Sequence, residues 1–152
     1  MRIRACDIYQ QTTNCTRWAP ATVHRWSASR LRTLFHGHTD APVRLHRIRN
    51  DQLYHRYLGD PIEVLMLHEN GTSERAIVGP DLRAGQCVQL LIPGNTFHTA
   101  RVIGDRRWFL GASTEWPGVE RVDVEIGDVE ALAIKYPEVA DDLRAFQRGR
   151  GD

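Results

Sequence analysis

Short stretches of alternating apolar and polar residues, separated by turn residues, constrain the fold of this sequence more than any other feature. From position 43 onward they return about every 8–12 residues, with Gly, Pro or Asn between them. The Asn70-Gly71 step between two of them is a strong hairpin signal. This spacing favours an antiparallel sandwich or barrel, and so an all-β fold. The strand candidates are residues 23–27, 30–36, 43–48, 52–58, 62–68, 73–78, 87–92, 97–103, 107–112 and 119–126; of these, 87–92 is apolar enough to suggest a buried strand.

Helical periodicity is confined to the C-terminal end of the chain. Asp128 is a candidate N-cap, and Pro137 can start a second helix. A chain of 152 residues can bury a core as one domain. We therefore expect a single domain, 1–152, and its expected parts are an N-terminal arm (1–22), a β-barrel (23–127), C-terminal helices (128–147) and a frayed tail (148–152).

Charge and cysteine content narrow the class of protein. The net charge is +1 and the basic residues are scattered, so neither nucleic acid nor a membrane surface is expected as a partner. Cys6, Cys15 and Cys87 form no C-x-x-C pair and are expected to be reduced thiols. The N-terminus lacks the apolar run of a signal peptide, and no stretch is apolar enough to span a membrane. We expect a cytoplasmic protein.

Several motifs resemble one known family. The runs Leu45–Ile48 and Asp51–Glu63 closely resemble the cupin-5 (DUF985) family, as do the elements Gly79-Pro80-Asp81-Leu82, Ile92-Pro93, Pro117-Gly118, Gly127-Asp128 and Tyr136-Pro137. The resemblance covers about residues 30–146. It implies a cupin jelly-roll β-barrel (double-stranded β-helix) and usually a homodimer. Family members are mostly of unassigned function, so the resemblance implies little about the reaction.

The sequence departs from the metal-binding pattern of cupins in general. That pattern has His-x-His, a Glu a few residues on, and a later His five residues after a Pro. His46 matches the first His and His98 the last, but Ile48 and Gln52 stand where the second His and the Glu would be. Two imidazoles and an amide are a weak donor set. We therefore predict no metal and no other cofactor, with a divalent metal held by His46, Gln52 and His98 as the alternative.

This chain also has ionisable residues at positions where the resemblance implies uncharged ones. The family would have an apolar or amide residue at position 98, where this chain has His98, and a small apolar residue at position 115, where it has Glu115. It would have Phe in place of Arg56 and aliphatic residues in place of His36 and His38. The His36-Gly37-His38 step looks like the metal motif, but no Glu follows it at the needed distance. We interpret it as unrelated to a metal site.

Strand alternation predicts which side chains share a pocket. Gln52, Tyr54 and Arg56 would lie on one face, and the resemblance turns that face inward toward His46 and His98. His55 and Tyr57 would lie on the outer face. Such a pocket suits proton transfer next to a carbonyl. The predicted catalytic residues are His98, His46, Tyr54 and Glu115, with Gln52, Arg56, Gln89 and Phe97 binding a small-molecule substrate.

Three functions stay open. The first is a metal-independent isomerase or epimerase, lyase or cyclase of a bacterial specialised-metabolite or sugar pathway. The stretch from Gln89 to His98 is similar to the equivalent element of the dTDP-sugar 3,5-epimerase type of cupin. The second is a metal-dependent enzyme, and the third is a cupin that binds a small ligand without chemistry. A purely structural role is the alternative for these residues: His46 could be a core residue hydrogen-bonded to a backbone carbonyl, and Glu115 could lie at a solvated strand end.

Overall fold

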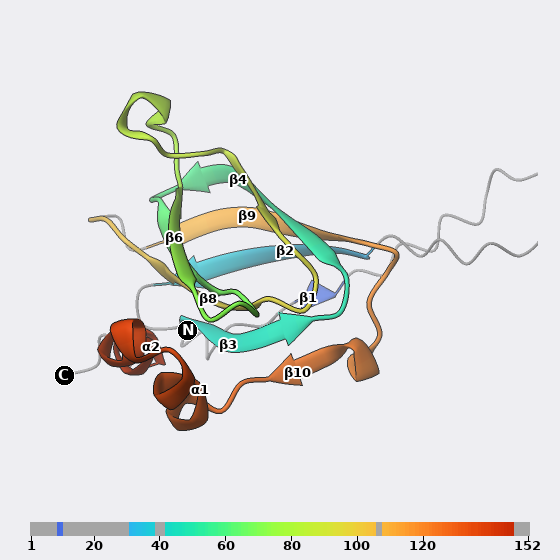
Figure 1. Cartoon of the computed structure of the whole chain (residues 1–152). Coiled ribbons are helices and arrows are strands. Elements are labelled where there is room, and N and C mark those ends of the chain that lie inside the picture. Colours follow the sequence, from blue (N-terminus) through green and yellow to red (C-terminus); the bar gives the residue numbers. More distant parts are fainter. Residues whose placement is uncertain (1–8, 11–30, 39–41, 106–107, 148–152) are drawn as a thin grey trace, which may run out of the picture.

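The computed structural model describes residues 9–10, 31–38, 42–105 and 108–147. Within these residues, ten strands form two five-stranded sheets, in the orders β1-β2-β9-β4-β7 and β10-β3-β8-β5-β6, and neighbouring strands pair antiparallel. The strands are β1 (Tyr9–Gln10), β2 (Leu31–His38), β3 (Val43–Ile48), β4 (Asp51–Gly59), β5 (Ile62–Leu67), β6 (Ser73–Val78), β7 (Gln89–Ile92), β8 (Phe97–Val102), β9 (Trp108–Trp116) and β10 (Val124–Ile126). The sheets face each other, with helices α1 (Val129–Lys135) and α2 (Ala140–Gln147) beside β3 and β10 (Figure 1).

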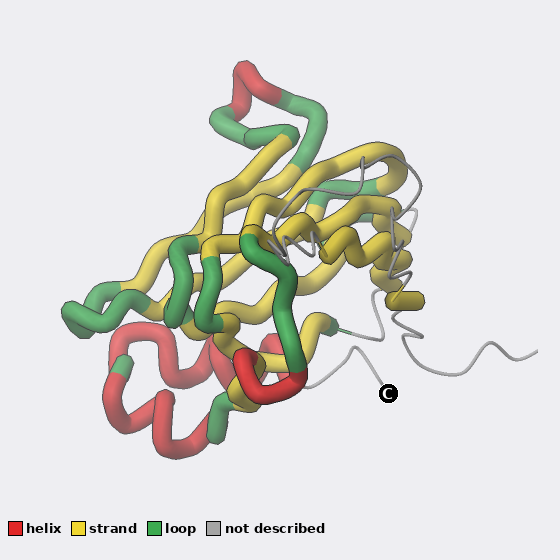
Figure 2. Tube along the Cα trace, turned by 90° about the vertical axis from the view of Figure 1, so that its right-hand side faces the viewer, coloured by secondary structure: helices red, strands yellow, loops and turns green. Residues whose placement is uncertain are grey.

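Alternation along β5 shows how one strand serves two cores. Ile62, Val64 and Met66 point into the space between the sheets, where they pack with residues such as Phe109. The intervening Leu65 and Leu67 point the other way, against the helices. Because successive side chains of a strand point to opposite faces, a strand buried on both sides is apolar at nearly every position; in β5 the exception is Glu63, which pairs with Arg75 and Arg101. Figure 2 shows the helices gathered against one side of the strands.

Most strand expectations are confirmed, and the Asn70-Gly71 turn joins β5 to β6 as expected. Three expectations are wrong, one of them the end of 107–112, because β9 continues to Trp116. The run 87–92 does not form a buried strand: β7 is the last strand of its sheet, and Leu91 is 58% exposed. Within 119–126, only Val124–Ile126 is a strand, because Arg121–Asp123 forms a 3₁₀ turn closed by a capping box from Glu120. The strand candidate 23–27 lies outside the described residues, as does most of the arm.

The C-terminal helices begin as the sequence predicts. The Asp128 side chain accepts hydrogen bonds from the backbone N–H groups of Glu130 and Ala131. Leu132 and Ala133 of α1 are buried against the outer face of β3 and β5. Residues Pro137–Val139 form a 3₁₀ turn that precedes α2, so the second helix starts three residues later than expected.

Replacing Asp128 with Ala should destabilise the protein by about 1 kcal/mol, because two helix N–H groups lose their acceptor. Asp128→Asn keeps an acceptor oxygen and should cost clearly less. Urea denaturation of both variants measures the difference. Equal stability of the Ala variant and the wild type would contradict this role of the cap.

Candidate functional site

Four buried polar side chains lie together on the inner face of β4 and β9. In the register of these strands, Gln52 is opposite Glu115 and Tyr54 is opposite Ser113. All four are at most 5% exposed. Polar groups buried in this way are costly unless they are hydrogen-bonded. Their gathering on neighbouring positions marks this face as a candidate site.

The opposite sheet contributes two imidazoles. His46 on β3 is paired with His98 on β8, and their ring centroids lie 4.3 Å apart. The Tyr54 hydroxyl lies 3.2 Å from Nε2 of His98, so a hydrogen bond joins the two sheets across the interior. We call Gln52, Tyr54, Ser113, Glu115, His46 and His98 the interior polar cluster.

The hydrogen-bond partners assign the protons of both imidazoles. Nδ1 of His46 lies 2.7 Å from the carbonyl oxygen of Arg44, and Nδ1 of His98 lies 3.2 Å from that of Thr96. A carbonyl oxygen only accepts, so in each ring Nδ1 carries the hydrogen and a neutral Nε2 carries a lone pair. The Tyr54 hydroxyl therefore donates to Nε2 of His98.

Burial shifts the pKa values of three side chains in the cluster. Burial, helped by the nearby His46, lowers the pKa of His98 to about 3. Burial also lowers the pKa of His46, against the opposing effect of its bond to Arg44. The pKa of Tyr54 is raised, first by burial and then by the negative charge of Glu115. At neutral pH the imidazoles are uncharged and the phenol keeps its proton.

Glu115 is held by one carboxylate oxygen only. Its Oε1 accepts from Nε2 of Gln52 at 3.1 Å and from the Ser113 hydroxyl. Its Oε2 is buried and has no hydrogen-bond partner among the described residues. The amide of Gln52 also donates to Ser113, so the three side chains form one connected group. A buried carboxylate oxygen without a hydrogen bond is energetically costly, and it can still accept a hydrogen bond from a donor.

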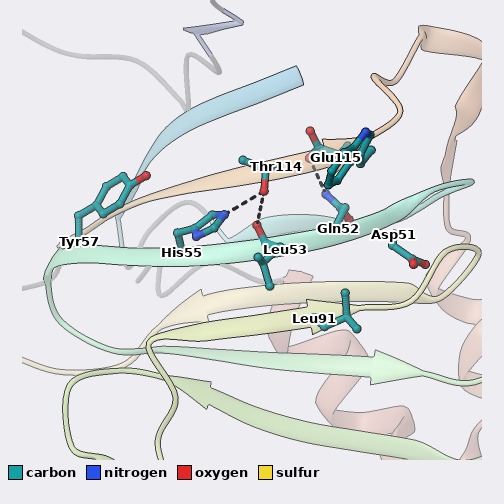
Figure 3. A pocket seen from close by; sticks show the side chains of 9 residues that line it. Asp51, Gln52, Leu53, His55, Tyr57, Leu91, Thr114 and Glu115 are labelled. Atoms are coloured by element: carbon teal, nitrogen blue, oxygen red, sulfur yellow. Dashed lines mark hydrogen bonds between the residues drawn. The ribbon is translucent and has the colours of Figure 1, made fainter. Parts of the chain in front are cut away.

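A pocket of about 620 Å³ adjoins this group (Figure 3). Its described lining comes from β4, β7 and β9 and consists of Asp51, Gln52, Leu53, His55, Tyr57, Leu91, Thr114, Glu115 and Trp116. Gln52 and Glu115 are among the lining residues, but their side chains bond to each other on the inner face, whereas His55 and Thr114 lie on the opposite face of the sheet. His55 is fixed in the wall, since its Nδ1 accepts from Gln89 and its Nε2 lies 2.9 Å from the Thr114 hydroxyl.

The structure separates the predicted site residues into two sets. It brings His46, His98, Tyr54, Gln52 and Glu115 together. Arg56 does not join them, because its guanidinium donates to the carbonyl oxygens of Gly59 and Tyr57.

Gln89 and Phe97 also lie away from the cluster. Gln89 is exposed and bonded to His55 on the outer face of its sheet. Phe97 packs toward the C-terminal helices, with the Arg47 guanidinium 4.8 Å from its ring centre. His68 lies beside the hairpin near Glu74. The side chains of His36 and His38 lie outside the described part of the structure.

Sequence reasoning missed Ser113, Asp51, Thr114 and Trp116. The expected strand ended at position 112, whereas β9 continues to Trp116. The available signal was the alternation of Ser113 with Glu115, two residues apart and therefore on one face of an extended chain.

Two facing antiparallel sheets that enclose a polar cluster define the class of fold, and the comparisons give its family. A family model described as "Cupin superfamily (DUF985)" matches residues 7–127, and the chain belongs to this family. The matched range starts at residue 7, whereas the motifs indicated a start at about residue 30. A search of curated proteins finds no significant match.

Solved structures agree with this fold. A Shewanella oneidensis protein is 22% identical with a TM-score of 0.73, over 90% of this chain and 85% of that one. A hypothetical protein from Leishmania major is 21% identical with a TM-score of 0.69, over 76% and 74% of the two chains. Oxalate decarboxylase from Bacillus subtilis is 12% identical with a TM-score of 0.53, over 79% of this chain and 31% of that one. At these identities the likeness concerns the fold. Within the described residues, no helix has the length and apolar character needed to cross a membrane.

The donor set of the cluster does not fit the metal site of many cupins. The described residues contain no group of three or more His, Cys, Asp or Glu side chains that could hold a metal ion. Nε2 of His98 already accepts from Tyr54, and Gln52 offers only an amide. Such a set lacks the ligands that a tightly bound transition metal needs.

The buried His98 should make stability depend on pH. Its pKa is lower in the folded protein than in the unfolded chain, so the unfolded chain takes up a proton first as the pH falls. Its contribution to stability is complete above the ordinary imidazole value of 6.5 and is lost progressively toward pH 3, by up to about 1.4 kcal/mol per pH unit. Urea denaturation between about pH 7.5 and about pH 5 should show a smaller decline in His98→Gln than in the wild type. Equal declines would refute the assignment.

Protein purified without chelator should contain less than about one-tenth of an equivalent of Zn, Mn, Fe, Co or Ni by elemental analysis. The reason is the weak donor set just described. A stoichiometric metal that disappears in His46→Ala would contradict this expectation and favour a metal-dependent enzyme.

Proposed function

We propose that this protein is a small-molecule enzyme of the cupin fold that transfers a proton on its substrate, with His46 as the base. The observation that supports this most is the pair of imidazoles, 4.3 Å apart, whose Nδ1–H groups are both tied to backbone carbonyls. This arrangement fixes both tautomers and leaves Nε2 of each ring as a neutral acceptor.

His46 suits the role of base better than His98. It is only half-buried, and its lowered pKa keeps it in the proton-accepting form at neutral pH. His98 is fully buried, and a pKa of about 3 makes it too weak a base to hold a proton near neutrality. The sequence had pointed to His98 first. In this proposal His98 and Tyr54 are positioning residues that fix the neighbouring ring and close the interior.

Gln52 and Glu115 suit substrate binding. They line the pocket and reach the interior polar cluster, and Oε2 of Glu115 has acceptor capacity left. The reaction class is removal of a proton next to a carbonyl group, followed by its return or by loss of a leaving group. Isomerisation, epimerisation, elimination and cyclisation all begin with this step.

The burial of His98 and Tyr54 favours a second candidate, a cupin that binds a small ligand without chemistry. Both side chains are at most 3% exposed, and neither they nor His46 are among the described residues that line the pocket. In that case the polar cluster would serve recognition and stability only.

Exchange of substrate hydrogens with D₂O separates the two candidates. The wild type should catalyse deuterium uptake next to the carbonyl in at least one member of a panel of 2-oxo acids, 1,3-dicarbonyl compounds and keto sugars. The rate should rise with pH, with its midpoint below the ordinary imidazole value of 6.5, because His46 must be unprotonated. His46→Gln should lower it about 100-fold or more, since a general base contributes at least that much. Mass spectrometry measures the uptake.

His68→Gln is the matched control, because His68 lies on the hairpin outside the cluster and its loss should leave the rate unchanged. Exchange that persists in His46→Gln would remove His46 as the base. No exchange with any member of the panel would favour the binding protein.

A further inference from the structure

We propose that Val124 and Ile126 of β10 form an apolar subsite that selects the substrate: a carbonyl compound with an aliphatic group close to the carbon that His46 deprotonates. This names a substrate class for the proposed function, and it rests on that function in taking His46 as the base. The register of the sheet that contains β3 and β10, and the exposure of its residues, support this inference.

One row of paired residues crosses this sheet from its edge to the imidazoles. Ile126 on β10 is opposite His46 on β3, and His46 is opposite His98 on β8. Next in the row, His98 is opposite Met66 on β5. Directly paired residues of antiparallel strands have their side chains on one face, with Cβ atoms about 5 Å apart. Because the rings of His46 and His98 meet in the interior, Ile126 points to the same side, next to His46.

The neighbouring pair supports this direction independently. Glu125 on β10 is opposite Arg47, and the two form an ion pair of 2.6 Å. The Arg47 guanidinium also lies over the ring of Phe97, which packs toward the C-terminal helices on the outer face of the sheet. Because successive side chains of a strand alternate, Val124 and Ile126 on either side of Glu125 face the interior.

Exposure along the row indicates the side from which His46 can be reached. Ile126 is 45% exposed and His46 is half-buried, whereas His98 and Met66 are at most 2% exposed. Within the described residues, β10 is the last strand of its sheet, so the row opens toward solvent at this edge (Figure 1). A substrate that reaches Nε2 of His46 from this edge passes over Ile126 and over Val124, which is 37% exposed.

The two side chains of β10 that face the interior are apolar and offer no hydrogen bond. A hydroxyl group placed on them would lose bonds to water without replacement, whereas an aliphatic group would gain from leaving water. Both the ligand and the partly exposed side chains would then bury apolar surface. The subsite therefore favours aliphatic carbonyl compounds over keto sugars, which carry hydroxyl groups along the carbon chain.

The test compares two neutral ketones of equal chain length, 2-hexanone and 5-hydroxy-2-pentanone, which end in a methyl and a hydroxyl group respectively. Binding is followed by NMR titration of the His46 ring C–H signals and, in the wild type, of the Val124 and Ile126 methyl groups. The wild type should bind 2-hexanone at least about fivefold more tightly. In the double variant Val124→Thr, Ile126→Thr, this preference should fall to about twofold or less, since threonine offers a hydroxyl group but keeps the β-branched shape that strands favour.

Val122→Thr is the matched control. Val122 is 87% exposed and lies in the 3₁₀ turn before β10, so the same substitution there should keep the preference. Equal binding of the two ketones to the wild type would overturn the inference, as would a preference that survives in the double variant or absence of binding by both ketones. Val124 and Ile126 methyl signals that respond to protein concentration and not to the ketone would assign these residues to contact with a second copy, and would overturn it too.

The result is separable from that of the deuterium-exchange experiment. A preference for 2-hexanone without any exchange would leave the subsite standing and remove only the proposed base. Exchange in the wild type without a preference between the ketones would remove the subsite and leave His46 as the base.

Discussion

The need to pair every polar group buried between the two sheets governs the centre of this molecule. The Tyr54–His98 hydrogen bond connects the sheets directly, and Gln52 ties β4 to β9 through Ser113 and Glu115. Each of these bonds fixes a side chain whose burial would otherwise cost several kcal/mol. At the start of β4, exposed Asp51 accepts a hydrogen bond from the backbone N–H of Gly94. Among the described residues, Oε2 of Glu115 is a buried acceptor that stays outside this network.

The sequence predicts those parts of the fold that depend on local pattern. The bounds of β3 and β6 follow from alternation, and the start of α1 follows from Asp128, because the period and the cap are local properties. The pairing of His46 with His98 followed from a family resemblance, since the two residues are far apart in the chain.

The parts that failed depend on partners elsewhere in the chain. The Arg56 guanidinium donates to the carbonyl oxygens of Gly59 and Tyr57 at the end of β4, and these partners could not be read from the sequence. The apolar run before Pro93 hides the two-residue period, so the exposed face of β7 could not be read from it. The extension of β9 to Trp116 requires pairing with β4 and β2, and this concealed Ser113 and the wall of the pocket.

Burial and charge together assign different roles to residues of the same type. Full burial lowers the pKa of His98 to about 3, so His98 accepts a hydrogen bond but is a poor base. His46 is only half-buried, and its pKa is also lowered by burial. Of the two rings, His46 is therefore the one that the proposed function takes as the base.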